Sequence, residues 1–211
     1  MQNCCSLNWF DIAKFVSEIV LTVVAISVSI IALFQTKKQI ELSNKQHLFD
    51  RRLEKYTIIE NILIQYECIS ILDIDYSSKD DLDTFAKIIL QSLYDCLILK
   101  DAQWTIDKLT DSTDCDANNV FLSQCSKLSV LSKEITIIFN NEKSNEVSKF
   151  IDNYAMLILT IYHYYTLTNS EQKEEYDLTK KIDEIYCRLK KLYKNIVDDN
   201  VMNLLLEETK L

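Results

Sequence analysis

The stretch Ile19–Thr36, IVLTVVAISVSIIALFQT, contains no charged side chain. As a helix it would span roughly 27 Å, since each residue adds about 1.5 Å, and this length is close to the hydrocarbon thickness of a bilayer. Its β-branched residues lower helix propensity in water, but lipid favours a helix because every backbone group must be hydrogen-bonded internally. We therefore expect this apolar segment to form an uncleaved transmembrane helix over 15–36, after a short extracytoplasmic N-terminus, 1–14.

Two other interpretations of the apolar segment stay open at this point. A cleaved secretory signal would have a basic start and a small-residue cleavage site, whereas Asp11 and Glu18 precede the segment and no A-x-A follows Phe34. A helix buried in a soluble core is the second alternative. Trp9 and Phe10 lie about two turns before the segment, a position typical of aromatic side chains at a membrane interface.

Positive charge collects directly after the apolar segment. Residues 37–55 carry six Lys or Arg against three acidic side chains, in a chain whose formal net charge is −9. By the positive-inside rule we expect a single-pass protein of the cell membrane, with the N-terminus outside and the C-terminal side cytoplasmic. Lys37, Lys38 and Lys45 are placed to contact anionic lipid headgroups, at about 1 kcal/mol each near the surface. The acidic remainder argues against a nucleic-acid partner, which would need a local basic face, for example at 180–194.

The chain has no glycine and no proline. Because these residues supply the special φ angles of tight hairpins and turns, their absence favours helices joined by polar loops. It also excludes the standard P-loop, dinucleotide-binding fingerprint, kinase glycine-rich loop, nucleophile elbow and EF-hand loop, which need glycine at set positions. We expect no catalytic, cofactor-binding or metal-binding residues, no cofactor and no enzymatic activity.

Apolar residues recur at helical spacing from Gln39 onward. Residues 37–72 should be a basic stalk and first bundle helix that continues the span, and 73–211 the remainder of a cytoplasmic bundle. A second helix should follow an N-cap at Ser77 or Ser78 and carry apolar residues as far as Leu109. Polar loops at 73–83 and 110–119 should separate it from its neighbours. The next helices should cover 120–140 and 145–167, and a fifth should follow a cap at 168–170 and break at 198–200.

These elements predict an all-α fold: one N-terminal transmembrane helix continuing into an antiparallel helical bundle of four or five helices. The helix at 145–167 could also touch the membrane, but its uncharged part, Met156–Thr168, is short for a span and favours a core helix. The apolar face that we expect on the first bundle helix comprises Phe49, Leu53, Tyr56, Ile59, Leu63, Tyr66 and Ile69.

Few residues suggest site chemistry. His47 lies in the basic stalk, and His163 is flanked by Tyr162 and Tyr164. A buried histidine beside tyrosine could act as a base, with cysteine thiols as nucleophiles, but the polar edge of a packed helix explains His163 more simply. The aspartates between residues 73 and 83 resemble a calcium loop only superficially, since they lack its glycine, and helix capping explains them better.

The seven cysteines do not form a disulfide or zinc pattern, because their number is odd, their spacing scattered and no CxxC pair exists. We expect those among apolar residues to be small core side chains: Cys68, Cys96, Cys125 and Cys187. Whether Cys4 and Cys5 are paired or modified stays open.

One segment carries a resemblance. LFQTKKQIELSNKQHLFDRRLEKY, Leu33–Tyr56, resembles the segment that follows the membrane span in a group of small single-span proteins of low-GC Gram-positive bacteria, and KFIDNY, Lys149–Tyr154, is similar to a later segment of that group. The two matches cover about a seventh of the chain. The resemblance implies a single-span topology and a bacterial origin, and it implies no catalytic residue.

Together these observations favour a membrane-anchored helical interaction or regulatory module. Its partners would be the bilayer and an unidentified protein, or a second copy of the chain bound through the long helix as a coiled coil. The alternative is a membrane-perturbing effector, such as a toxin or defence protein that acts through its span. A hydrolase or nuclease with a non-standard site is a third class.

Overall fold

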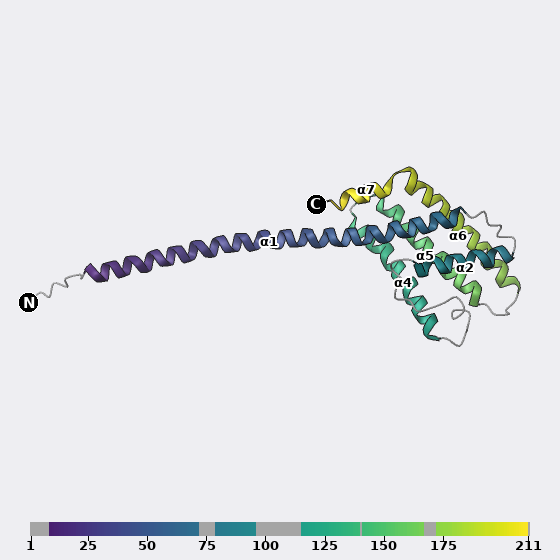
Figure 1. Cartoon of the computed structure of the whole chain (residues 1–211), viewed down its shortest axis with the longest axis horizontal. Coiled ribbons are helices and arrows are strands. Elements are labelled where there is room, and N and C mark those ends of the chain that lie inside the picture. The colour runs from purple at the N-terminus through teal and green to yellow at the C-terminus, as the bar shows by residue number, and fades with distance from the viewer. Residues whose placement is uncertain (1–8, 72–78, 96–114, 140, 167–171, 211) are drawn as a thin grey trace, which may run out of the picture. The chain divides into compact units, whose positions relative to one another are not determined.

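The computed structural model describes residues 9–71, 79–95, 115–139, 141–166 and 172–210. Across these residues it contains six helices and no strand (Figure 1). The chain divides into two compact units, Met1–His47 and Leu48–Leu211, which we call the N-terminal unit and the helical unit. The prediction of an all-α protein is therefore confirmed for the part of the chain that the structure describes.

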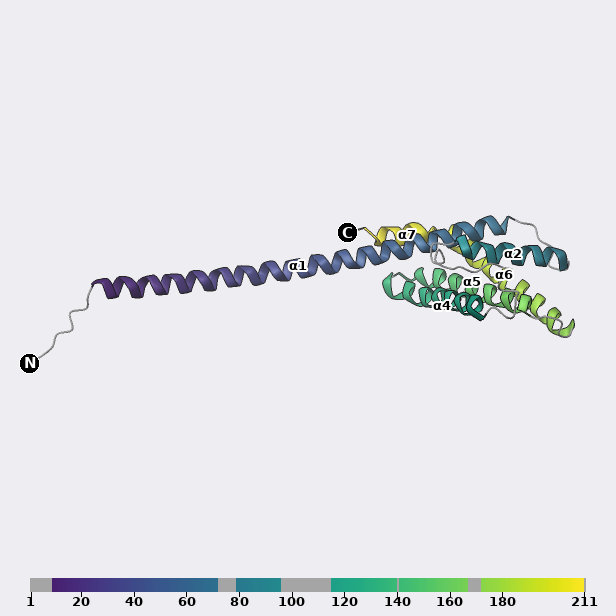
Figure 2. The ribbon, with the colours of Figure 1, turned by 60° about the horizontal axis from the view of Figure 1, so that its bottom comes forward.

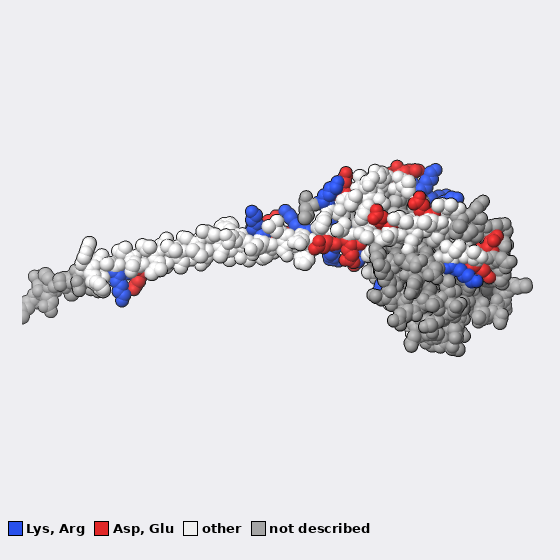
Figure 3. All heavy atoms as spheres, in the orientation of Figure 1, with Lys and Arg blue, Asp and Glu red and all other residues white. Residues whose placement is uncertain are grey.

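Helix α1 (Trp9–Ser70) carries the apolar segment. Every side chain of this segment is exposed, and Figure 3 shows it as a length of helix without charge. The hydroxyl groups of Thr22, Ser27, Ser29 and Thr36 each donate a hydrogen bond of 2.7 to 2.9 Å to the carbonyl oxygen four residues earlier. Among the described residues, α1 is the one helix that is long and apolar enough to cross a bilayer.

The helical unit contains the C-terminal part of α1 and five further helices. They are α2 (Lys79–Asp95), α4 (Cys115–Ile138), α5 (Ser144–Thr166), α6 (Gln172–Asp198) and α7 (Val201–Glu208). Helix α5 packs along α4, as Figure 2 shows, and also along α6. It contacts α2 as well, so α5 is the central helix of the unit, whereas α7 packs on α6.

The core of the helical unit is apolar and rich in aromatic rings. Tyr66 of α1 is fully buried. Its ring meets the ring of Phe150 edge-on at 5.1 Å between centroids, and it also contacts Tyr154 at 6.5 Å and Tyr193 at 5.3 Å. Edge-to-face pairs place the positive ring edge against a negative ring face, which stabilises them beyond their buried area. These contacts tie α1 to α5 and α6.

Helix α4 begins earlier than the sequence predicted. We expected a loop through Asn119, but α4 starts at Cys115. The polar run was misleading because aspartate and asparagine are also favoured at helix starts. A tertiary contact helps to hold this turn, since the hydroxyl group of Tyr162 donates a 3.0 Å hydrogen bond to Asn118 Oδ1.

Helix α2 begins at Lys79, so the polar loop expected over 73–83 ends earlier than predicted, and the remaining boundaries agree with expectation where the structure describes them. Helix α5 matches the predicted 145–167 within one residue at each end, and α6 ends at Asp198, where a break was predicted. Helix α2 ends at Asp95. The predicted caps at 77–78 and 168–170, and the continuation of the second helix to Leu109, lie outside the described residues.

The predicted apolar face of the first bundle helix needs one correction. Tyr56, Ile59, Leu63, Tyr66 and Ile69 are buried as expected. Leu53 is instead 42% exposed, and Ile62, which the prediction left out, is fully buried. Apolar residues three or four positions apart fit either of two neighbouring stripes on the helix surface. The spacing alone does not show which stripe is buried.

Two cysteine predictions are wrong. Cys125 is buried in the core, as expected, but Cys68 and Cys187 are exposed. Both lie beside buried residues on their helices, and a stretch of apolar neighbours does not reveal which way one side chain turns. Cys96 lies outside the described residues.

Helix α5 is a core helix. Its apolar side chains are largely buried within the helical unit, including Phe150, Ile151, Leu157, Ile158 and Ile161. This burial favours the core interpretation of 145–167 over membrane contact.

Candidate interaction surface

A groove of about 270 Å³ lies between α1, α6 and α7 in the helical unit, and we call it the α1–α6 groove. From α1 it is lined by residues spaced at i, i+3, i+4 and i+7, and from α6 by residues 193, 196 and 197, spaced at i, i+3 and i+4. Such spacing brings side chains onto one face of a helix. The lining residues are Glu60, Leu63, Ile64, Glu67, Tyr193, Ile196, Val197, Asn200 and Met202.

The floor of the α1–α6 groove is apolar, and its walls are exposed. Leu63 and Ile196 are buried, whereas their chain neighbours Ile64 and Val197 are 52% and 56% exposed. Each exposed side chain therefore stands beside a buried one at the edge of the core. Single exposed apolar residues are common, but two on facing helices beside one hollow mark a candidate contact surface.

Two carboxylates flank this apolar floor, and each lies near a tyrosine. Tyr56 donates a 3.3 Å hydrogen bond from its hydroxyl group to Glu60 Oε1. The carboxylate of Glu67 lies near the hydroxyl group of Tyr193. Burial raises the pKa of both tyrosines, and the negative charge of each glutamate raises it further. Both hydroxyl groups therefore stay protonated across the physiological pH range, and that of Tyr56 orients the carboxylate of Glu60.

A left-handed residue shapes the end of the groove. Asn200 joins α6 to α7 with φ of 52°, and its backbone turn places Met202 at the groove. Asparagine tolerates this conformation better than most residues, which matters in a chain without glycine. The side chain of Asn203 donates a 2.6 Å hydrogen bond to Asn200 Oδ1 and so supports the turn.

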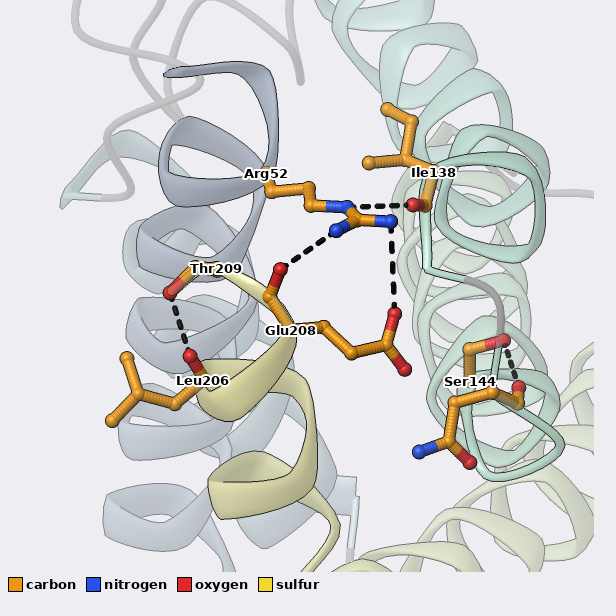
Figure 4. A network of polar contacts seen from close by, with 7 residues as sticks. Arg52, Ile138, Ser144, Leu206, Glu208 and Thr209 are labelled. Atoms are coloured by element: carbon orange, nitrogen blue, oxygen red, sulfur yellow. Dashed lines mark hydrogen bonds and ion pairs between the residues drawn. The ribbon is translucent and has the colours of Figure 1, made fainter. Parts of the chain in front are cut away.

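Arg52 fixes the elements around the groove. Figure 4 shows its guanidinium group between the C-terminal ends of α4 and α7. Nε donates to the carbonyl oxygen of Ile138 at 3.0 Å, and Nη1 donates to that of Glu208 at 2.7 Å. Nη2 lies 3.9 Å from Glu208 Oε2. Each carbonyl belongs to the last residue of its helix, at the negative end of the helix dipole, so a cation is favoured there.

A second ion pair joins α1 to α4. Lys55 Nζ lies 2.9 Å from Glu134 Oε2, and the lysine side chain is largely shielded from solvent. Together with Arg52, this pair attaches the α1 wall of the groove to α4, so the groove is built on a fixed frame.

The histidines do not form a catalytic arrangement in the described structure. His163 is exposed on α5 and lines a smaller hollow of about 200 Å³ with Lys181 and apolar side chains. The adjacent tyrosines turn to other helices: Tyr162 bonds to Asn118, and Tyr164 donates a 3.2 Å hydrogen bond to Asp83 Oδ1. The exposure of His163 agrees with a polar helix edge.

The basic stalk is exposed. Lys37, Lys38, Lys45 and His47 all face solvent. Lys45 forms a 3.2 Å ion pair with Glu41 one helical turn earlier, whose energy is small because both groups are well exposed. Within the described residues, no group of three or more His, Cys, Asp or Glu side chains is placed to hold a metal ion.

The α1–α6 groove was not predicted from the sequence. The apolar residues were assigned to buried helix faces, and the glutamates were assigned to faces exposed to solvent. The adjacent apolar pairs Leu63-Ile64 and Ile196-Val197 gave only a weak signal, because adjacent helical positions can be buried together, as Phe150 and Ile151 are.

Comparison of the chain with protein-family models, with curated proteins and with solved structures gives no match.

Proposed function

We propose that this protein is a membrane-tethered interaction or regulatory module without catalytic activity, and that its contact surface is the α1–α6 groove. In this proposal α1 anchors the chain, and the helical unit acts as an antiparallel bundle in the cytoplasm. The basic stalk lies at the inner membrane surface, where Lys37, Lys38 and Lys45 meet anionic headgroups.

One observation carries the proposal. The apolar segment is wholly exposed, yet its four hydroxyl groups are hydrogen-bonded within the helix. Exposed apolar area of this extent is unfavourable in water at about 25 cal/mol per Å². In lipid the same surface is favourable, because every polar backbone and hydroxyl group within it has an internal partner.

The charge pattern supports the orientation. Lysines follow the apolar segment directly, while Asp11 and Glu18 precede it. The similarity of Leu33–Tyr56 to single-span bacterial proteins supports the same topology.

The test is a membrane-fraction pull-down with the full chain as bait. We expect the chain to sediment with membranes, and we expect a reproducible partner or self-association that is weakened by Ile64→Gln. The matched control is Ile137→Gln on α4, a position that is 80% exposed and lies outside the groove. A chain that stays in membranes yet captures no partner and does not self-associate would contradict the proposal.

Overexpression separates this proposal from a membrane-perturbing effector. An interaction module should leave the membrane potential unchanged. Depolarisation that disappears when Ile19–Phe34 is scrambled would instead show that the span itself is the active element.

A further inference from the structure

Resting on the proposed function, the α1–α6 groove also carries information about the chemistry of its partner. We infer that the groove binds a basic amphipathic helix of another protein, with apolar side chains against Ile64 and Val197 and two cationic side chains paired with Glu60 and Glu67. The partner helix would lie along α1.

The size of the groove favours a helix over a small molecule. Small-molecule pockets usually enclose roughly 300 to 1,000 Å³ and bury most of the ligand. The α1–α6 groove has about 270 Å³, slightly below this range, and is partly open to solvent. It therefore has room for a few projecting side chains, which is how amphipathic helices dock into apolar grooves.

The charge of the groove selects a basic partner. Its described lining contains two carboxylates, Glu60 and Glu67, and no Lys or Arg. Tyr56 donates a hydrogen bond to Glu60, so that carboxylate is oriented before a partner arrives, and Glu67 lies near the hydroxyl group of Tyr193. A groove that carries charges of one sign binds partners of the opposite charge selectively, and it associates with them faster.

The spacing of the carboxylates sets the spacing of the cations. Glu60 and Glu67 are seven residues apart on α1, or about 10 Å along the helix axis at roughly 1.5 Å per residue. A partner helix that runs beside α1 meets both when Lys or Arg recur every seventh residue, as charged flanking positions do in helix pairs. Ile64 lies between the two glutamates, so the partner needs leucine-sized side chains between its cations.

The experiment uses the full chain in uncharged maltoside micelles and two fluorescent helical peptides. The basic peptide repeats lysine every seventh residue with two leucines between, and the acidic peptide replaces each lysine with glutamate. We expect fluorescence anisotropy to show binding of the basic peptide only. Because single exposed ion pairs contribute little, the decisive variant reverses both charges, Glu60→Lys with Glu67→Lys, and should weaken basic-peptide binding by about tenfold or more while allowing the acidic peptide to bind.

A matched double reversal controls for the acidity of the whole chain. Asp152→Lys with Glu184→Lys changes the net charge equally at two exposed carboxylates outside the groove, and it should alter binding less than about twofold. Circular dichroism should show unchanged helix content in both double variants. Equal losses in the two would overturn the inference, because they would indicate non-specific attraction to an acidic protein.

Other results identify other occupants and also overturn the inference. Tetraphenylphosphonium binding that is lost in the groove reversal, without peptide binding, would indicate a small lipophilic cation. Self-association that is lost in that variant would indicate a second copy of the chain. If the groove reversal leaves partner capture from membranes intact and the basic peptide does not bind, the chain is still an interaction module, but the groove is not its basic-helix site.

Discussion

At the scale of single residues, Arg52 shows how a chain without glycine ends its helices. Its side chain supplies donors to the last carbonyls of α4 and α7, positions that a glycine-based cap often satisfies in other proteins. It is also the one described arginine that hydrogen-bonds two helix ends in this structure. Removing it takes these donors away from the junction of three helices.

We therefore predict that Arg52→Met destabilises the helical unit by about 2 kcal/mol, since hydrogen bonds to a charged group contribute about 1.5 to 3 kcal/mol and the site is partly shielded. Urea unfolding of the full chain in micelles, followed by far-UV circular dichroism, measures this loss. Arg51→Met is the matched control, because Arg51 is exposed. Equal effects of the two substitutions would show that the Arg52 contacts contribute nothing.

The cysteines provide a second test at this scale. Burial raises the pKa of the Cys125 thiol to about 12, so it stays protonated and unreactive at neutral pH, whereas Cys68 and Cys187 are exposed. Brief treatment of the native protein with N-ethylmaleimide should label Cys68 and Cys187 and spare Cys125, as read by peptide mass spectrometry. Unfolding in urea should make all three react. Rapid native labelling of Cys125 would contradict the packing of α4 in the core.

At the scale of elements, helical periodicity predicted well which segments are helices. It predicted less well where a helix begins and which side chains at the edge of an apolar face are buried. Tyr56, Ile59 and Tyr66 were placed correctly because a strong stripe of large apolar residues must be buried. The start of α4 was missed because polar residues serve both loops and first turns. The α1–α6 groove depends on how α1 and α6 pack, and this tertiary information is absent from the spacing on either helix.

The corrected face of α1 yields a direct comparison. Ile62→Ala should cost about 2 to 5 kcal/mol, because it removes a fully buried side chain and leaves a cavity. Leu53→Ala should change stability by less than about 0.5 kcal/mol, because Leu53 is largely exposed. Urea unfolding measures the free energy of unfolding of the two variants. A larger loss of stability for Leu53→Ala than for Ile62→Ala would support the apolar face predicted from the sequence instead.

The turn between α6 and α7 provides another test. Asn200→Gly should keep or slightly raise stability, whereas Asn200→Ala should cost about 1 kcal/mol because alanine is strained at positive φ. Asn195→Ala, within α6, should be neutral or stabilising because alanine favours a helix. Thermal unfolding of the three variants checks this order. Equal stability of Asn200→Ala and Asn200→Gly would argue against a left-handed residue 200.

At the scale of the whole molecule, two environments divide the chain. The helical unit places its apolar side chains in its own core, while the apolar segment of α1 leaves its side chains exposed. A protein in water would be expected to cover such a surface. The proposed anchor resolves this contrast, because lipid takes the place of a packed core along that length of α1.

Sedimentation of the full chain without detergent probes the proposed anchor most directly. We predict that the intact chain stays with membranes after alkaline carbonate washing and yields no soluble monomer. A variant with Val24→Lys and Ile26→Lys should be released, since each charge near the centre of a span costs about 2.5 to 3.5 kcal/mol. A freely soluble, monomeric chain with Ile19–Thr36 intact would contradict the membrane anchor and the function built on it.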